Sequence, residues 1–272
     1  MTTSQKQIRH VLGISGGKDS AALAIYMRDK LQDVEYFFCD TGSELEETYE
    51  FLNKLEAYLG KPITRLNPER DFDWWLQRNK NFLPSARTRW CTVDLKLKPL
   101  EKWIGDDEAI SYVAIRADED GRKAYMNPRG NIRTVLPFVE AGIDKAGVHK
   151  ILERAGVGLP KYYEWRTRSG CYFCFFQRKM EWVGLLEKHP EKFKAAMAYE
   201  KSDEKTGKRF TWNQNESLEE LSRPERVAEI KARHKEAMEK ERTAAKNKPL
   251  SEVLEGALNT DDDTPPCQIC NL

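Results

Sequence analysis

The chain has 272 residues, of which 40% are apolar and 33% charged, enough for one large domain or a domain with a small accessory unit. Its charges nearly cancel to a net +1, so the net charge gives no evidence for a nucleic-acid partner and any basic surface has to be local. The N-terminal residues lack the apolar region of a signal peptide, and no stretch reaches the roughly 18 apolar residues of a membrane helix. We therefore expect a soluble, cytoplasmic protein with no membrane partner.

The first half of the chain alternates between short apolar runs and segments with helical spacing. Strands are expected at 9–15, 34–39, 63–66 and 111–116, and helices at 21–27, 44–59 (with Ser43 as N-cap) and 94–104. This alternation implies right-handed crossovers and a twisted parallel sheet with flanking helices. Ligands of such a sheet bind at the carboxyl ends of its strands.

The second half of the chain is expected to be mainly helical around cysteines. Helical spacing is found at 144–156, 178–199 and, in a highly charged segment, 217–246; a polar linker at 259–266 precedes a second Cys-x-x-Cys pair. Three regions result: an α/β domain at 1–140, a helical region with the first cysteine pair at 141–215, and a charged helix with a cysteine tail at 216–272.

A glycine-rich turn joins the first expected strand to the first expected helix. The turn reads Ser15-Gly16-Gly17-Lys18-Asp19-Ser20. Two glycines allow close backbone approach, the helix N-terminus offers free N–H groups, and Lys18 adds positive charge. The spacing is not that of a Walker A motif. These features predict a cradle for the phosphates of a nucleotide.

Four further motifs make the sequence resemble a known superfamily. They are Asp40-Thr41-Gly42, Arg89-Trp90-Cys91-Thr92, Ile115-Arg116-Ala117-Asp118-Glu119 and Arg168-Ser169-Gly170-Cys171-Tyr172-Phe173-Cys174. With the glycine turn, they resemble the PP-loop superfamily and, within it, the phosphoadenosine phosphosulfate (PAPS) reductase branch. The resemblance covers roughly residues 10–200. It implies the adenine nucleotide alpha hydrolase-like fold, with a helical, cysteine-containing C-terminal part.

The resemblance also implies which residues bind ATP. The phosphates would lie on residues 15–20 and on Asp40, Thr41 and Gly42, and ATP would be split between its α and β phosphates. Arg116, at a strand end, is the candidate phosphate clamp. Lys18, Asp19 and Arg116 are the expected catalytic residues, and Asp19 and Asp40 could hold Mg²⁺ with the phosphates.

Five cysteines are candidate metal ligands: Cys91, Cys171, Cys174, Cys267 and Cys270. The spacing of Cys171 and Cys174 lets both thiolates reach one metal or cluster. An iron–sulfur cluster, most simply of the 4Fe-4S type, is implied by the resemblance; a zinc site and two buried structural thiols are the alternatives. The tail pair could supply a fourth ligand, which we favour, or a nucleophile, or the fourth iron could stay open. Cys39, inside an apolar strand, is expected to be a core residue.

Basic and aromatic side chains allow two interpretations each. Arg87, Arg89, Lys96 and Lys98 around Cys91 could contact an anionic substrate or form a solvated face; Arg166, Arg168, Arg178 and Lys179 would favour thiolates at the first cysteine pair. Trp74 and Trp75 are expected in packing, with base stacking as the alternative. Segment 221–248 has nine Lys and Arg against five Glu and is interpreted as a solvated helix or a contact to a nucleic-acid backbone.

The stretch from Leu159 to Gln177, continuing to Glu181-Trp182 and His189-Pro190, resembles the DndC/SspD-type components of DNA phosphorothioation systems. This resemblance implies an ATP pyrophosphatase that adenylates a DNA backbone phosphate, so that sulfur can displace AMP in an anti-phage system. DNA would be the acceptor, a cysteine desulfurase the sulfur donor, and other phosphorothioation subunits the partners. The alternatives are a sulfonucleotide (PAPS or adenylyl-sulfate) reductase, a tRNA thiolation enzyme, and a nucleotide-sensing subunit with a structural metal.

Overall fold

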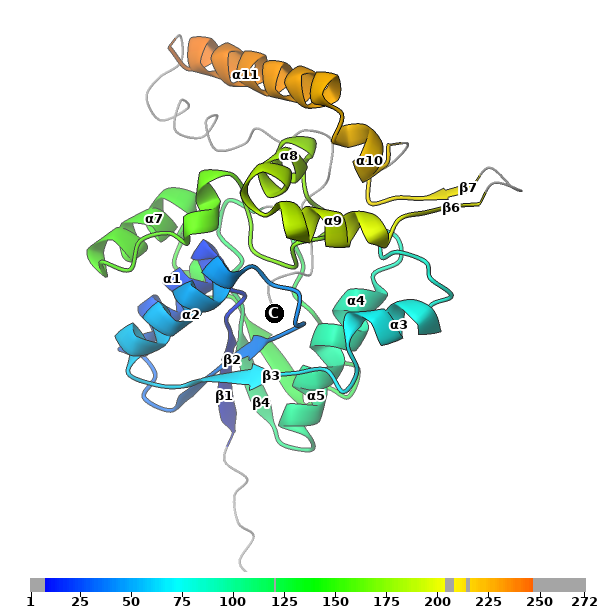
Figure 1. Cartoon of the computed structure of the whole chain (residues 1–272). Helices are drawn as coiled ribbons and strands as arrows, with labels where there is room; N and C mark the ends of the chain where they lie inside the picture. The colour runs from blue at the N-terminus through cyan, green and yellow to red at the C-terminus, as the bar shows by residue number, and fades with distance from the viewer. Residues whose placement is uncertain (1–7, 120, 204–207, 214–215, 247–272) are drawn as a thin grey trace, which may run out of the picture. The chain divides into compact units, whose positions relative to one another are not determined.

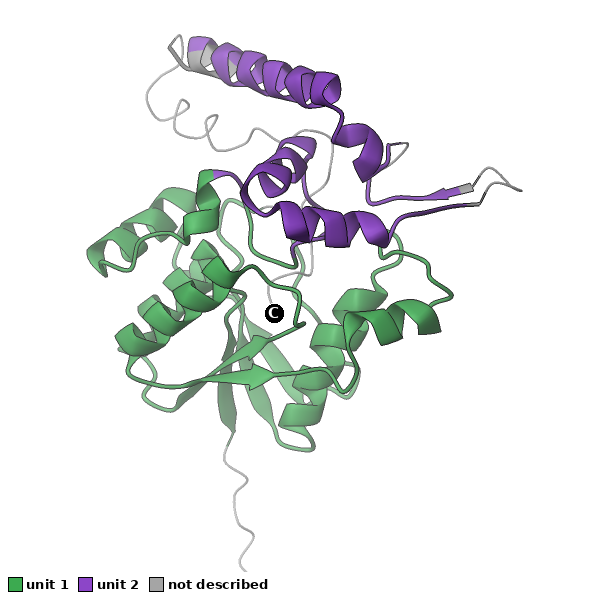
Figure 2. Ribbon diagram, viewed as in Figure 1, with its two compact units in different colours: residues 1–164, 168–171, 267–272 green, residues 165–167, 172–266 purple. Residues whose placement is uncertain are grey.

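A computed structural model describes residues 8–119, 121–203, 208–213 and 216–246, and these form two compact units (Figures 1 and 2). Unit 1 comprises residues up to 164 together with 168–171, and unit 2 comprises 165–167 and residues from 172 onward. This division differs from the domain boundary predicted at residue 140, because residues 141–164 belong to unit 1. The predicted linker at 259–266, the tail cysteines Cys267 and Cys270, and residues 247–248 lie outside the described residues.

Unit 1 is built on a parallel sheet of five strands in the order β3-β2-β1-β4-β5. The strands are β1 (Arg9–Gly13), β2 (Val34–Cys39), β3 (Ile63–Leu66), β4 (Ala109–Tyr112) and β5 (Ile132–Val135). The predicted α/β fold class is confirmed. Since the chain proceeds outward from β1 to β3 and then returns to β4 on the other side, the crevice between the loops after β1 and β4 is a topological switch point.

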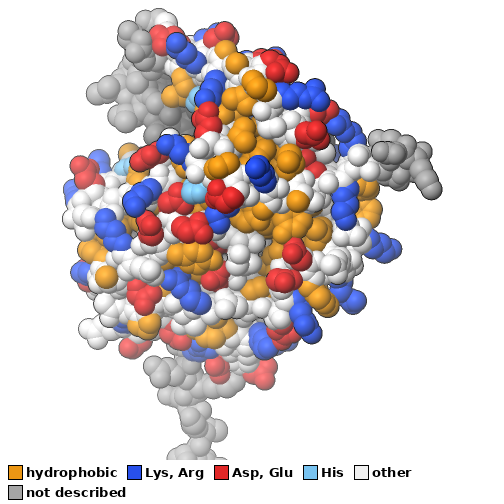
Figure 3. All heavy atoms as spheres, viewed as in Figure 1, with side chains coloured by type: hydrophobic (Ala, Val, Ile, Leu, Met, Phe, Trp, Pro, Cys, Tyr) orange, Lys and Arg blue, Asp and Glu red, His pale blue; other side chains and the backbone are white. Residues whose placement is uncertain are grey.

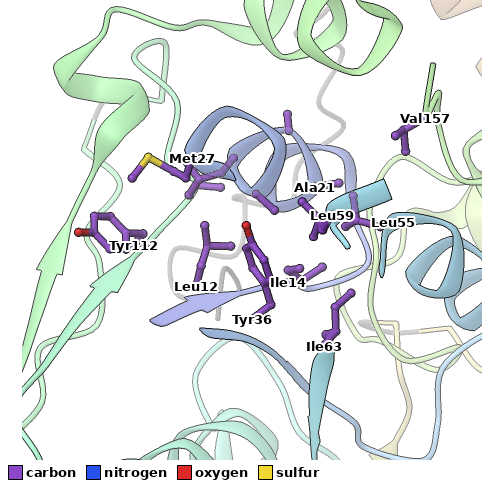
Figure 4. Close-up of a cluster of buried hydrophobic side chains, with 14 of the residues drawn as sticks. Leu12, Ile14, Ala21, Met27, Tyr36, Leu55, Leu59, Ile63, Tyr112 and Val157 are labelled. Carbon is purple, nitrogen blue, oxygen red and sulfur yellow. The ribbon is translucent and has the colours of Figure 1, made fainter. Parts of the chain in front are cut away.

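Two hydrophobic layers cover the faces of this sheet. The helical segments of unit 1 are α1 (Lys18–Arg28), α2 (Glu46–Leu59), α3 (Phe72–Arg78), α4 (Trp90–Thr92), the π-helical turn η1 (Val93–Leu97), α5 (Lys98–Ile104), α6 (Pro137–Glu140), α7 (Lys145–Arg154) and the 3-10 turn η2 (Lys161–Glu164). Successive side chains of a strand point to opposite faces of the sheet: Leu12 packs with α1, α2 and α7, whereas Val11 packs with η1 and α5. Figure 4 shows Leu12, Ile14 and Tyr36 in the first of these layers.

The helices of unit 1 depart from the sequence prediction at three places. The helix expected at 44–59 begins at Glu46, and its N-cap is Leu45 without a side-chain hydrogen bond, so the predicted cap Ser43 is wrong. The helix expected at 94–104 extends back to Trp90 and widens to a π turn before Pro99, whose ring nitrogen has no N–H to donate. Helix α3 was not predicted; Asp71 caps it by accepting a hydrogen bond from Trp74 N.

Unit 2 is a helical unit with an aromatic core. Its elements are α8 (Lys179–Lys188), α9 (Pro190–Ala198), the hairpin β6 (Lys201–Asp203) and β7 (Lys208–Phe210), α10 (Leu218–Leu221) and α11 (Pro224–Lys246). The expected helix at 178–199 is divided at His189-Pro190. Trp212 stacks on Phe173 and donates its indole N–H to Ala196 O at 2.8 Å. Glu200 accepts hydrogen bonds from Trp212 N and Leu218 N, which fixes the chain after the hairpin.

The described surface mixes both signs of charge. On the face shown in Figure 3, acidic and basic side chains are interspersed. Helix α11 follows the same rule: Arg226 pairs with Glu216 and Glu229, and Lys231 pairs with Glu187. These pairs agree with a solvated helix. Among the described helices, none combines the length and the apolar character that a bilayer crossing needs.

Gly184, inside α8, provides a test of the packing of unit 2. A Cβ there would lie 2.6 Å from Cε3 of the Trp165 ring. Glycine-to-alanine exchange in a helix normally stabilises by about 1 kcal/mol, but overpacking a rigid ring costs about 1–3 kcal/mol. We therefore expect Gly184→Ala to lower the free energy of unfolding, measured by urea denaturation. In a Trp165→Leu background the same exchange should cost much less; equal costs in both backgrounds would refute the packing contact.

Candidate active site

The backbone of the phosphate loop depends on Gly16. Its φ of 77° lies in the left-handed region, and a Cβ there would lie 2.5 Å from Cγ2 of Thr48 on α2. Gly16 O also accepts a hydrogen bond of 2.7 Å from Tyr162 OH. The loop is therefore held from α2 on one side and from η2 on the other, and only glycine fits between them.

Serine hydroxyls form a chain of hydrogen bonds along the loop. Ser20 Oγ accepts from Ser15 N at 3.0 Å and donates to Gly17 O at 3.2 Å. Ser15 Oγ lies 3.1 Å from Ser20 Oγ and accepts from Ser169 Oγ at 3.2 Å. Since each hydroxyl has one proton, the chain runs from Ser169 through Ser15 to Ser20 and ends on the loop carbonyl.

Tyr163 and Ser169 approach the second glycine closely. A Cβ on Gly17 would lie 2.8 Å from Ser169 Oγ and 3.4 Å from Tyr163 OH. Lys18 N donates to Tyr163 OH at 3.2 Å, and Lys18 Nζ lies 5.5 Å from the centre of the Tyr163 ring. The first N–H groups of α1 are thus lined by hydroxyls, which places polar atoms where a phosphate oxygen would bind.

Three charged side chains meet at the topological switch point. Asp19, at the start of α1, binds Lys18 Nζ through Oδ2 at 3.2 Å and Arg116 Nη1 through Oδ1 at 3.1 Å. Arg116 follows β4 and also makes a bidentate pair with Asp118 at 2.9 and 3.2 Å. Its backbone N–H donates to Glu119 at 3.0 Å. The loops after β1 and β4 are therefore joined by ion pairs.

The pKa values of these groups follow from burial and from their neighbours. Burial alone would raise the pKa of Asp19, but the charges of Lys18 and Arg116 outweigh it and hold the pKa below its usual range. Burial would lower the pKa of Lys18, yet Tyr163 and Asp19 raise it. Arg116 is likewise raised in pKa, against its burial, by Asp118 and Asp19. All three groups are charged at neutral pH.

Two residues of α7 extend this positive region. A hydrogen bond from Ala117 N to Ile143 O places the start of α7 beside the loop that carries Arg116. Burial, Lys18 and Arg116 lower the pKa of Lys145 to about 8. One turn later, burial, Lys18 and Lys145 lower the pKa of His149. Like charges that repel one another in this way mark a site whose free energy falls when an anion binds.

The second predicted nucleotide motif, Asp40-Thr41-Gly42, follows β2 at the same edge of the sheet. Asp40 Oδ1 accepts from Gly42 N at 2.9 Å and from Tyr49 OH at 2.7 Å. Asp19, in contrast, contacts cations of the protein with both oxygens and is placed to orient Lys18 and Arg116. The Asp19–Asp40 magnesium pair stays a prediction.

Cys171 lies beside Thr41. Its Sγ is 3.2 Å from Thr41 Oγ1 and 3.9 Å from Glu44 Oε1, and Thr41 donates its only proton to Glu44 at 2.8 Å. The Cys171–Thr41 contact is therefore made by the thiol proton. When the sulfur gives up this proton to bind a metal, the Thr41 hydroxyl is the nearest group that can turn to donate to it.

The remaining cysteines have different surroundings. Cys39 belongs to the core between the sheet and α5, donates to Lys96 O, and is raised in pKa by burial to about 12, so its prediction as a core residue is confirmed. Cys91 lies in α4 and Cys174 in unit 2, both partly exposed. The soft thiolates of Cys91, Cys171 and Cys174 suit an iron–sulfur cluster or zinc.

Several basic residues near the cysteines have defined partners. Lys179 pairs with Glu216 at 2.7 Å, which offsets the charge expected to favour thiolates. Arg89 donates to Thr92 Oγ1 at 3.3 Å, and Lys98 pairs with Asp94 at 2.5 Å while lying over the Trp75 ring. Within unit 2, Glu181 accepts from the backbone and hydroxyl of Thr167, which fixes the chain just before the cysteine motif.

Sequence reasoning missed five residues that surround the loop. Thr48, Lys145, Tyr162, Tyr163 and Ser169 all contact the loop or its charged groups, yet most are more than a hundred residues from it in sequence. The quoted motif around Cys171 contained Ser169 and followed both tyrosines. The family resemblance of this motif pointed to its cysteines. The hydroxyls of Ser169, Tyr162 and Tyr163, which bind the phosphate loop, were not recognised.

Comparisons with known proteins agree with this geometry. Residues 9–137 match the model of the phosphoadenosine phosphosulfate reductase domain. An uncharacterized protein of Methanocaldococcus jannaschii is 35% identical over 178 residues, covering 60% of this chain and 35% of that protein. The tRNA-specific 2-thiouridylase of Ligilactobacillus salivarius is 24% identical over 189 residues, covering 58% of this chain and 50% of the relative.

A crystal structure of the phosphoadenylyl-sulfate reductase of Candida auris superposes with a TM-score of 0.47 and 14% identity, covering 62% of this chain and 84% of that one. The chain spans about a third to a half of the length of the two curated relatives described above. The matched residues 9–137 include β1 to β5, the phosphate loop and Arg116. Residues 9–137 of the chain are thus similar to the phosphoadenosine phosphosulfate reductase domain.

Proposed function

We propose that the protein cleaves ATP to AMP and pyrophosphate and uses the energy to adenylate a phosphate of the DNA backbone, which is then converted to a phosphorothioate. The observation that carries the ATP step is the cationic site at the switch point. Lys18 and Arg116 are held in place by one carboxylate, Asp19, and the N-terminus of α1 lies beside them. Such a preorganised site stabilises charge that develops on phosphate oxygens.

In the proposed reaction an oxygen of the acceptor phosphate attacks the α-phosphorus of ATP. The bond from that phosphorus to the bridging oxygen breaks, and pyrophosphate leaves with the electron pair. Lys18 and the loop amides neutralise the leaving pyrophosphate, and Arg116 clamps a non-bridging oxygen. The Asp19 carboxylate keeps both cations oriented before substrate binds. None of these steps needs a proton transfer from the loop.

The second half-reaction is a sulfur transfer. A cysteine desulfurase supplies sulfur as a persulfide, and a thiol reductant, which becomes a disulfide, releases it as hydrosulfide. The hydrosulfide attacks the acceptor phosphorus, loses its proton to solvent, and AMP leaves with the electron pair of the broken P–O bond. Cys91, Cys171 and Cys174 would hold an iron–sulfur cluster, which when bound supplies a place for the incoming sulfur atom. Thr41 would steady the Cys171 sulfur. DNA as acceptor, a role in anti-phage defence and association with other phosphorothioation subunits complete the proposal.

Thiolation of tRNA is the second candidate function. The similarity to a tRNA-specific 2-thiouridylase favours it. Both candidates share the adenylation step and differ in the polymer that carries AMP. Radiolabelled ATP incubated with DNA or with tRNA distinguishes them, because the adenylated polymer retains the label of the α-phosphate. Label on neither polymer, with ATP still cleaved, contradicts both acceptors.

We expect Lys18→Met to reduce the formation of AMP and pyrophosphate by roughly 100-fold or more, since one charged group at the developing anion is lost. Lys18→Arg should retain part of the activity. Lys30→Met, at an exposed lysine just after α1, is the matched control and should act like the unaltered protein. Anaerobic assays with labelled ATP and chromatography of the products measure this. Tight sulfonucleotide binding without ATP cleavage points instead to a reductase.

The pKa of Lys145 gives a pH dependence. Bound polyphosphate raises this pKa above the value of about 8 in the unliganded protein, so binding takes up a proton once Lys145 is neutral. Affinity for a non-hydrolysable ATP analogue should therefore fall between about pH 7.5 and 9.5, with roughly tenfold per unit as the limiting slope. Calorimetry in buffers of different ionisation enthalpy measures the proton uptake. Lys145→Met should weaken binding at pH 7.5 and flatten the dependence; an unchanged slope would exclude Lys145.

Substitution of single cysteines tests the metal ligands. After anaerobic purification, Cys91→Ser, Cys171→Ser and Cys174→Ser should each lower the iron content and the visible absorption of a cluster. Cys39→Ala, in the buried core, is the control and should retain the metal of the unaltered chain. Zinc in place of iron in all preparations contradicts the cluster. Full iron in the Cys171 variant removes this residue from the ligand set.

A further inference from the structure

Helix α3 and the loop after it present aromatic and cationic side chains that the ATP site does not use. We infer that this surface, defined by Trp74, Arg78, Lys80, Phe82 and Arg87, binds a single-stranded nucleic acid by stacking on its bases. The inference deepens the proposed function, because it names the form of polymer that acts as acceptor. It rests on the proposed function only for that role, since strand binding itself needs no ATP.

The local charge of this segment differs from that of the whole chain. Residues 74–93 contain four cationic and no acidic side chains: Arg78, Lys80, Arg87 and Arg89. Two of the three acids just before them are engaged, since Asp71 caps α3 and Glu69 pairs with Lys102, and the third, Asp73, lies in the first turn of α3. An excess of positive charge confined to twenty residues gives a backbone-binding strip on a protein of nearly zero net charge.

Two aromatic rings are exposed within this strip. Trp74 is 39% exposed and Phe82 is 49% exposed. The guanidinium groups of Arg70 and Arg78 lie 5.7 and 5.9 Å from the centre of the Trp74 ring. Exposed rings flanked by arginines are the combination that single-strand-binding grooves use, since rings stack on bases while cations contact phosphates.

The scaffold holds these rings rigidly. Phe72 and Leu76 anchor α3 in the interior, and the Phe72 ring packs on Trp90 at 5.2 Å. Trp90 Nε1 donates to Phe82 O at 3.1 Å, which fixes the backbone of the exposed phenylalanine. The presentation of Phe82 is thus built into the fold.

The backbone that delivers Phe82 is strained. Lys80 and Asn81 both have positive φ, 55° and 59°, a conformation that is unfavourable for a lysine. Hydrogen bonds from Lys80 N to Gln77 O and from Asn81 N to Leu76 O hold this turn at the end of α3. A glycine here would relieve the strain but would lose the lysine charge.

The position of the strip suits an acceptor. Helix α3 follows the carboxyl end of β3, and the phosphate loop follows the carboxyl end of β1. Because all five strands are parallel, both lie at the same edge of the sheet. The strip continues through Arg87, at the tip of a turn closed by hydrogen bonds between Ser85 and Thr88, toward α4 and Cys91.

The test uses the full chain and a fluorescein-labelled oligonucleotide of about 15 nucleotides, near the upper end of single-strand site sizes. Fluorescence anisotropy without ATP compares the DNA strand, the RNA strand of the same sequence, and the DNA duplex. We expect either single strand to bind more tightly than the duplex. The preferred single strand identifies the sugar that is recognised. Equal or tighter binding of the duplex overturns the inference.

Variants separate stacking from packing. Trp74→Leu keeps apolar bulk but no ring face, and should weaken strand binding roughly tenfold, as should Phe82→Ala. Trp74→Phe should retain most of the affinity. Arg78→Gln should lower the salt dependence by about 0.7 for one lost phosphate contact. Val139→Ala, an equally exposed apolar residue on α6, is the matched control.

Two measurements distinguish a failure of the strand-binding surface from a failure of the proposed enzyme activity. Hydrolysis of ATP to AMP and pyrophosphate in the absence of polymer, with water in place of the acceptor phosphate, should be unchanged in Trp74→Leu, which also shows that the variant is folded. Unchanged strand affinity in Trp74→Leu and Phe82→Ala overturns the stacking surface, whether or not ATP is cleaved. Conversely, absence of ATP cleavage with ring-dependent strand binding overturns the proposed enzyme and leaves the surface standing.

Discussion

The arrangement of the candidate site in unit 1 depends on the two ion pairs of the Asp19 carboxylate. It lies at the start of α1, is only 19% exposed, and holds a lysine of its own loop and an arginine of the loop after β4. A buried carboxylate with one partner removed leaves an uncompensated charge, which costs several kcal/mol. The two loops of the switch point are therefore fixed together through one side chain, and the N-terminus of α1 is fixed with them.

Around this ion pair the chain collects polar atoms from distant positions. Hydroxyls of Tyr162, Tyr163 and Ser169 bind the phosphate loop, while Thr48 closes the space beside Gly16. The three hydroxyl contacts are polar, whereas Thr48 contributes its methyl carbon, and the loop rests on a well-packed layer of α1, α2 and the sheet. The domain thus combines a hydrophobic scaffold with a polar rim, as expected where strands end and a ligand binds.

Much of the fold could be predicted from the sequence, because local patterns determine it. Apolar runs with glycine between them predicted β1 to β3, and the motif around Arg116 predicted a strand end beside the phosphate loop. The role of Lys145 could not be predicted, because a lysine on a helix has no local signal of the charges that tertiary packing brings near it. Helix α3 was not predicted because its seven residues, two of them tryptophans, are too few to show a helical period. In addition, its cap Asp71 stands among other acids and does not stand out in the sequence.

For the cysteines, spacing alone did not predict the surroundings of each sulfur. Spacing predicted a shared metal site, and the structure places Cys171 at the end of β2 beside Thr41, which no spacing rule describes. The tail cysteines lie outside the described residues, so their roles stay predictions. The magnesium pair also stays a prediction, and both oxygens of Asp19 contact cations of the protein itself in this structure.

The short distance along the chain between Ser169 and Cys171 has a thermodynamic consequence. Ser169 donates to the phosphate loop and Cys171 contacts Thr41, with only Gly170, at φ 134°, between them. Three consecutive residues therefore belong to two sites at once. Linkage is reciprocal, so whatever free energy a phosphate at the loop contributes to ordering the sulfur, a ligand on the sulfur returns equally to the affinity for phosphate. The peptide from Ser169 to Cys171 would therefore couple an anion bound at the phosphate loop to a ligand bound on the Cys171 sulfur.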